Sequence, residues 1–189
     1  MDDSSESGSR TRTRRAIVAA AIEVLGRNSA APLGEIATAA QVGRTTLHRY
    51  FPERSDLLAA VVTEGLARLS RAGERARLDR GTGAEAFLRL CTEYFELGDL
   101  LSLIFTEAEF TEDPAWSDDE LDREFFAMVA RGHADGTLDP ALPVEWLQSL
   151  LWSQLYAAWS YLNEHDATRH EVLVLLTNTL TKAVAPPPG

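Results

Sequence analysis

Six donor side chains gather in one short segment of the chain. They are Arg44, Thr45, Thr46, His48, Arg49 and Tyr50. The segment's other residue, Leu47, is apolar, so a helix here would turn Leu47 inward and the donors outward. A helix of this length fits the major groove of B-DNA, which is about 12 Å wide. The chemistry available to this segment is therefore hydrogen bonding to bases and phosphates.

Position along such a helix predicts a division of roles. The first residues of a recognition helix approach base edges, so we expect Arg44, Thr45 and Thr46 to read sequence, with arginine suited to O6 and N7 of guanine. The later three donors would hold phosphates. Arg54, expected near the positive end of a long helix, would add charge to a further phosphate site. The alternative for Arg54 is a surface ion pair.

Charge is distributed unevenly along the 189 residues, whose formal net charge is -11. Residues 10–54 hold eight arginines against three glutamates, a net of +5, whereas residues 81–189 hold five basic residues against nineteen acids, a net of -14. Only the contacting surface of a nucleic-acid-binding protein has to be basic. The distribution indicates that the N-terminal quarter meets a polyanion.

Arg14 belongs to a group of four arginines at positions 10, 12, 14 and 15. These lie in the first turns of a predicted helix, where the helix dipole disfavours each cation by roughly 0.3–1 kcal/mol. A polyanionic partner would compensate that cost. The alternative is a solvated basic run, neutralised by the acidic residues that precede it.

Hydrophobic spacing predicts an all-α chain of about nine helices. The expected helices are 10–27, a short one after Pro32, 44–50, one from about Ser55 to Asp79, 84–97, 99–109, 118–134, 143–164 and 168–184. Residues 33–50 have the pattern of a helix, a tight turn and a second helix, with Gly43 expected to supply the turn. Residues 1–9 and 185–189 are expected to be flexible tails.

Residues 33–58 resemble the signature of the TetR/AcrR family of transcriptional regulators. The matching positions are Ile36-Ala37, Val42-Gly43, Thr46 to Phe51, Arg54 and Leu57-Leu58. The resemblance implies a DNA-binding helix-turn-helix domain at 10–54, whose third helix reads operator DNA, and an effector-binding and dimerisation domain at 55–184. Three positions depart from the family pattern, since Gln41-Val42-Gly43 replaces a Gly-Val-Ser turn, His48 a tyrosine and Arg54 a lysine.

Aromatic residues concentrate in the C-terminal part of the chain. A ligand cavity and an ordinary core have the same composition, so either interpretation is open for any one of them. The resemblance implies a cavity, and the expected wall positions are Phe105, Trp116, Phe125, Met128, Trp152, Tyr156 and Trp159. Such walls favour an apolar or aromatic effector, with a cationic one as the second option because tryptophan attracts cations.

The last two predicted helices are apolar on more than one face. One core cannot cover both faces, which fits a two-fold interface between two subunits. The expected interface residues are Leu147, Leu151, Leu155, Leu162, Val172, Leu176 and Leu180. The alternative is that both helices are central within one chain.

The sequence predicts no catalytic site, metal site or cofactor. The histidines lack a partner cluster, there is no phosphate-binding glycine loop, and the single Cys91 lies in an apolar pattern typical of a buried thiol. No apolar run is long enough to span a membrane, so we expect a cytoplasmic protein. The resulting hypothesis is a homodimeric repressor released from a palindromic operator by a small molecule. The alternatives are a helical small-molecule-binding protein and an activator of the same family.

Overall fold

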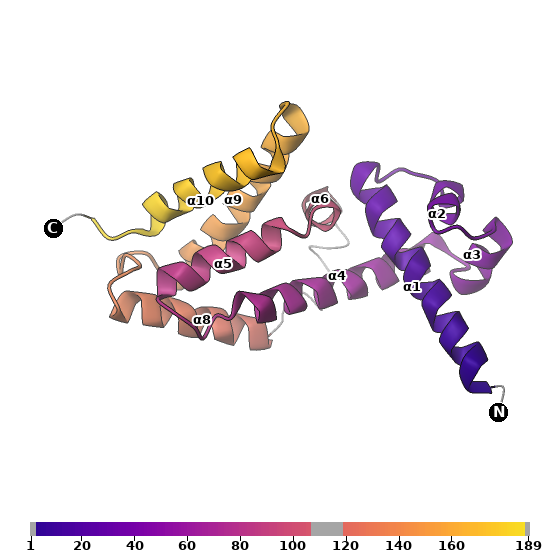
Figure 1. The fold of residues 1–189 in the computed structure, drawn as a ribbon, viewed down its shortest axis with the longest axis horizontal. Coiled ribbons are helices and arrows are strands. Elements are labelled where there is room, and N and C mark those ends of the chain that lie inside the picture. The colour runs from indigo at the N-terminus through magenta and orange to yellow at the C-terminus, as the bar shows by residue number, and fades with distance from the viewer. Residues whose placement is uncertain (1–2, 107–118, 188–189) are drawn as a thin grey trace. The chain divides into compact units, whose positions relative to one another are not determined.

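The computed structural model describes residues 3–106 and 119–187, and every regular element in those ranges is a helix (Figure 1). The helices are α1 (Asp3–Arg27), α2 (Leu33–Ala39), α3 (Arg44–Tyr50), α4 (Arg54–Ala76), α5 (Gly83–Phe95), α6 (Asp99–Thr106), α8 (Asp119–Ala134), α9 (Val144–Glu164) and α10 (Arg169–Val184). The predicted all-α fold is confirmed, and most helix ends lie within three residues of their expected positions.

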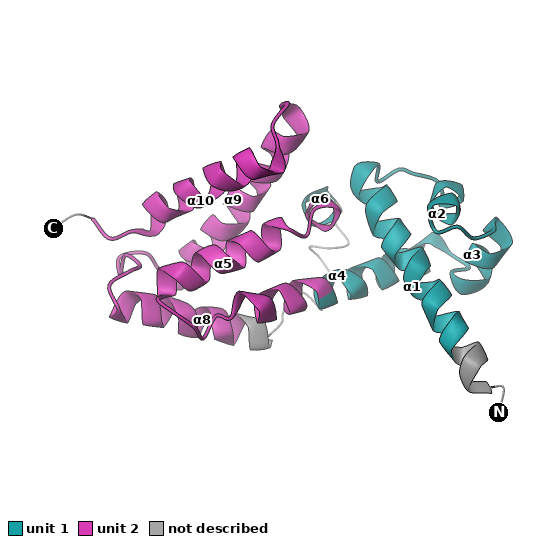
Figure 2. Cartoon of the chain, in the orientation of Figure 1, with its two compact units in different colours: residues 1–67, 102–116 teal, residues 68–101, 117–189 magenta. Residues whose placement is uncertain are grey.

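The chain forms two compact units, residues 1–67 with 102–116 and residues 68–101 with 117–189 (Figure 2). The division falls inside the continuous helix α4. Helix α1 begins at Asp3, within the segment that was expected to be a flexible tail. The predicted functional boundary after residue 54 stays a prediction.

The N-terminal unit is built on a small apolar core in which α1 contacts α2 and α2 contacts α3. Ile17, Ile36 and Leu47 are essentially inaccessible to solvent. The turn between α2 and α3 differs from the expectation. Gln41 takes the left-handed conformation, with φ of 56°, whereas Gly43 has an ordinary φ of -70° and precedes the first residue of α3. The sequence did not indicate this conformation, because the left-handed region is typical of glycine and asparagine and not of glutamine.

The C-terminal unit packs α10 on α9 and α5, and α5 on α8. Helices α5 and α8 approach closely where Gly83 meets Gly132, so that a Cβ atom added to Gly83 would overlap the backbone of Gly132. Two capping boxes fix helix starts, Thr82 with Glu85 at α5 and Thr168 with Glu171 at α10.

The residues expected at a dimer interface lie instead inside the C-terminal unit, which corrects that prediction. Six of the seven are buried within the single chain: Leu147, Leu151, Leu155, Val172, Leu176 and Leu180. They lie on α9 and α10, which pack on each other and on α5. Leu162 is partly exposed. Periodicity identified an apolar face correctly but assigned it to the wrong neighbour.

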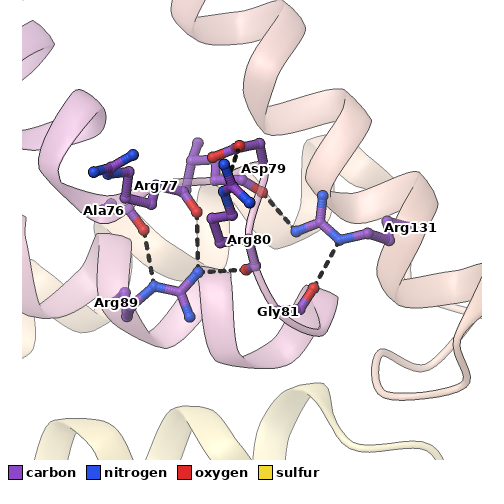
Figure 3. Close-up of polar contacts among 8 residues, drawn as sticks. Ala76, Arg77, Asp79, Arg80, Gly81, Arg89 and Arg131 are labelled. Atoms are coloured by element: carbon purple, nitrogen blue, oxygen red, sulfur yellow. Dashed lines mark hydrogen bonds and ion pairs between the residues drawn. The ribbon is translucent and has the colours of Figure 1, made fainter.

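Two arginines hold the loop that follows α4 (Figure 3). Arg89 of α5 donates from Nε to the carbonyl of Ala76 at 2.9 Å and from Nη2 to the carbonyl of Arg77 at 3.0 Å. Arg131 of α8 donates to the carbonyls of Gly81, at 3.1 Å, and Leu78. These carbonyls lie at the last residue of α4 or in the loop after it, where the helix offers them no partner, so the guanidinium groups satisfy them.

The end of α8 is tied to the start of α5 by Asp135. Its carboxylate accepts hydrogen bonds from Thr137 Oγ1 at 2.6 Å and from the Gly83 amide at 2.9 Å. The Thr137 hydroxyl and then the Gly83 amide hold the pKa of Asp135 below its usual value. Because the pKa of Asp135 is lower in the folded state than in the unfolded state, its ionised carboxylate stabilises the fold. This stabilisation is fully present above the unfolded-state pKa. It is lost as the pH falls through the folded-state pKa.

We therefore expect Asp135→Asn to destabilise the protein at pH 7 and to have little further effect near pH 3. Thermal unfolding of both proteins between these pH values measures the difference. The exposed Asp166, replaced by asparagine in the same way, is the control. A difference in melting temperature that is the same at pH 7 and pH 3 would contradict the assignment.

Candidate nucleic-acid interface

Helix α3 presents its polar residues to solvent because its apolar residue anchors it. Leu47 has 1% of its surface exposed, whereas Arg44, Thr45, His48 and Arg49 are exposed. Thr46 and Tyr50 are partly exposed. Leu47 therefore faces inward, and four of the six donors are exposed. Contact with DNA by these side chains stays a prediction.

Arginines of α1 lie along the C-terminal end of α3. The guanidinium of Arg14 lies 5.3 Å from the ring centre of Phe51, and that of Arg10 lies 6.0 Å from the ring centre of Tyr50. Arg49 approaches the same tyrosine ring at 5.7 Å. Cation–π contacts of this kind orient arginine side chains over aromatic faces. Arg10 and Arg14 are more than thirty positions from Arg49 in the sequence. The structure brings all three arginines into one basic surface.

Arg54 has a different environment from the one expected. Its Nη1 donates to the carbonyl of Ala31 at 2.8 Å and its Nη2 to the carbonyl of Ser29 at 2.6 Å. Both acceptors belong to the loop between α1 and α2, so this guanidinium fixes the position of α2. These two hydrogen bonds tie the start of α4 to the loop before α2, and the phosphate contact expected of Arg54 stays a prediction.

A groove of about 800 Å³ runs beside α3 in the same unit, between α2 and the end of α1. Arg44, Leu47 and His48 line it from α3, and Gly34 and Thr38 line it from α2. The Arg44 side chain therefore borders the groove and is exposed at the start of α3. The guanidinium of Arg44 lies close to Gly34 of α2, and its contact with a base stays a prediction.

The residues expected to line an effector pocket lie in several places. Phe125 is buried on α8, with its ring centre 6.1 Å from that of Phe87 on α5, and Met128 on α8 is also buried. Trp152 of α9 stacks on Tyr94 of α5 at 5.4 Å. These contacts follow from the packing of α5 against α8 and α9.

The other expected wall residues are less enclosed. Tyr156 is 49% exposed and its ring lies 5.5 Å from that of Trp159, which is partly exposed. Phe105 is partly exposed on α6. Trp116 lies outside the described residues. A single cavity lined by all seven residues remains a prediction.

Other chemistry finds little support in the part of the chain that the structure describes. Burial raises the pKa of the Cys91 thiol to about 12, which makes its reactive thiolate form scarce at neutral pH. No group of three or more His, Cys, Asp or Glu side chains within residues 3–106 and 119–187 could hold a metal ion. In those same ranges, no helix is both long and apolar enough to cross a membrane.

Comparison with known proteins places these observations in a family. Residues 17–61, from α1 to the start of α4, match the family model described as bacterial regulatory proteins of the tetR family. The chain is also 34% identical over 184 residues to the HTH-type transcriptional repressor LfrR of Mycolicibacterium smegmatis, covering 95% of this chain and 94% of that protein. The chain belongs to the TetR family. It is accordingly a transcriptional regulator and not an enzyme.

Solved structures agree with the TetR-family assignment. The crystal structure of the TetR-like regulator LfrR from Mycobacterium smegmatis in complex with proflavine has a TM-score of 0.69 and 31% identity, covering 93% of this chain and 98% of that one. A tetR-family regulator from Rhodococcus RHA1 has a TM-score of 0.71 at 16% identity, covering 93% of this chain and 98% of that one, and is similar in fold. The resemblance inferred from residues 33–58 is thus confirmed along nearly the whole chain.

Sequence reasoning missed residues whose importance depends on contacts between distant positions. Gly34 adjoins the Arg44 side chain, and Arg89 and Arg131 hold the loop after α4. These three residues have no signal in the sequence alone. Arg10 was already grouped with Arg14 in the sequence, and the structure adds its approach to the Tyr50 ring.

Proposed function

We propose that this TetR-family regulator is a dimeric repressor that binds a palindromic operator through α3 and leaves it when a small aromatic molecule binds. The observation that carries the DNA-binding site is the row of exposed donors on α3, anchored by the buried Leu47 and continued by Arg10 and Arg14 of α1. Donors from the start of the helix suit base edges, and arginines beside its end suit phosphates.

A second copy of the chain is proposed to cover the outer surface of α9 and α10. Leu175 is 52% exposed and Tyr161 is 41% exposed, although the opposite faces of both helices are buried. A groove of about 150 Å³ lies between the two helices, lined by Leu175, Tyr161, Ala157 and their neighbours. A two-fold dimer through this surface would present two α3 helices to the two half-sites of a palindrome. These exposed residues replace the buried leucines first expected at the interface.

An aromatic effector is supported by two kinds of observation. Aromatic pairs such as Tyr94 with Trp152 and Phe87 with Phe125 lie where α5 contacts α9 and α8. The similar regulator LfrR was crystallised with proflavine, a planar aromatic cation. We infer the same ligand class for this chain, with Trp152 as a stacking surface for the ligand.

The test uses purified protein and fluorescent DNA from upstream of its own coding sequence. We expect proflavine to lower operator affinity by about 5- to 150-fold, the range of typical coupling between two sites. Trp152→Ala should raise the proflavine concentration needed for release by about 2- to 12-fold, which corresponds to the roughly 0.5–1.5 kcal/mol of a lost aromatic stack. The control is Trp146→Ala, on the same helix and 59% exposed, which should respond like the wild type.

Proflavine also intercalates into DNA, so a second repressor on its own operator is titrated in parallel. Release of that unrelated repressor at the same concentration would show an effect on DNA and not on this protein. Equal responses of Trp152→Ala and Trp146→Ala would contradict the proposed position of the ligand. Tight binding to the upstream DNA that no aromatic ligand alters would contradict release by this class of ligand.

A further inference from the structure

Gly34 of α2 leaves a space that the side chain of Arg44 fills. A Cβ atom added to Gly34 would lie 2.9 Å from Arg44 Nη2 and 3.1 Å from both Cζ and Nε. Three atoms of one planar group at nearly equal distances mean that the guanidinium lies with its flat face toward this position. The arginine that we propose reads the operator therefore rests against the α2 backbone.

The α2 backbone itself does not require glycine at this position. Gly34 lies within a regular α-helix, where its carbonyl accepts a hydrogen bond from Thr38 Oγ1 at 3.0 Å, and it is not among the residues with positive φ. Alanine or leucine would be the better helix former in such a place. The close approach of Arg44 is thus the feature of the structure that a side chain at Gly34 would disturb.

We propose that Gly34 is a positioning residue that sets the direction in which Arg44 points out of α3, and through it the base preference of the protein. This role rests on the proposed reading of DNA by Arg44. A bidentate contact with guanine depends on the orientation of the guanidinium plane. An arginine already supported along α2 also loses less conformational freedom on binding than one that moves freely in solvent. A side chain at position 34 would push the guanidinium away from α2 and spoil both.

The proposal predicts opposite effects on DNA binding and on stability. Gly34→Ala should weaken operator binding slightly, and Gly34→Leu should weaken it about tenfold, within the value of one bidentate base contact. Both variants should melt at or above the temperature of the wild type, because the substituted residue favours the helix. Gly8→Ala is the matched control, since a Cβ atom there meets no other atom within 4 Å.

The experiment first selects a binding sequence for the wild-type protein from random DNA. It then measures the affinity of each protein for that sequence and for DNA in which the guanine expected to contact Arg44 is replaced by another base. We expect Gly34→Leu to lose both affinity and preference for that base, and to have no further effect in an Arg44→Ala background. If Gly34→Leu bound the operator as tightly as the wild type, the proposed role of Gly34 would be wrong. The same would follow if Gly34→Leu caused an equal loss of operator affinity in the Arg44→Ala background. Either result would leave the proposed DNA binding by α3 standing. Failure of the wild type to select any sequence would overturn the proposed function, and this role with it.

Discussion

Replacing Arg44 and Arg49 together by alanine should reduce operator affinity at least about a hundredfold, because one bidentate base contact is worth roughly 1–3 kcal/mol and a dimer loses it twice. Both side chains are exposed on α3, while Leu47 keeps the helix in place. Thermal stability should therefore change little. Fluorescence anisotropy with labelled operator DNA at several salt concentrations measures the loss.

The two single variants should differ in kind. Arg49→Ala should weaken binding to all sequences and reduce the slope of log affinity against log salt by about 1 per lost phosphate contact. Arg44→Ala should instead reduce the difference in affinity between operator and unrelated DNA. The control removes the same charge from the C-terminal unit, by Arg75→Ala and Arg80→Ala, whose side chains pair with Glu93 and Asp79. Equal losses in this control would mean that net charge, and not the α3 surface, determines binding.

Gly83→Ala is expected to destabilise the fold strongly, because the added methyl group would overlap the backbone of Gly132 where α5 crosses α8. Neither backbone can move without separating packed helices, so the strain resembles overpacking of a core at about 3 kcal/mol or more. That corresponds to a fall in melting temperature of about 6–12 °C for a protein of this size. Differential scanning calorimetry measures it.

The matched control is again Gly8→Ala, where the added carbon atom has open space. Alanine favours a helix over glycine, so this control should leave the melting temperature unchanged or raise it slightly. Equal melting temperatures for Gly83→Ala and Gly8→Ala would contradict the close crossing of α5 and α8. Gly132 has a separate reason to be glycine, because a Cβ atom there would overlap the side chain of Leu138.

The helices were predictable from sequence because apolar residues recur at helical spacing along each of them. The partner of each apolar face was not. Leu155 and Leu176 were assigned to a second subunit, yet both are buried inside one chain, whereas Leu175, the neighbour of Leu176, is exposed. Periodicity reports that a face is covered and carries no information about which element covers it.

The candidate site was predictable to the extent that it lies on one helix. The exposed donors of α3 follow from its length and from the single apolar Leu47. The environment of each arginine did not follow, since it depends on residues distant in sequence. Arg54 binds the loop at Ser29 and Ala31, and the turn before α3 is made by Gln41, whose left-handed φ has no signature in its side chain.

Selection of binding sites from random DNA by the full-length protein, at physiological salt, tests the central claim most directly. We expect a palindrome whose half-sites lie about 34–36 Å apart, or a multiple of that spacing, and affinity for it that exceeds affinity for unrelated DNA by about 10³-fold or more. Enrichment of no sequence, with equal weak binding to all DNA, would contradict operator recognition by α3.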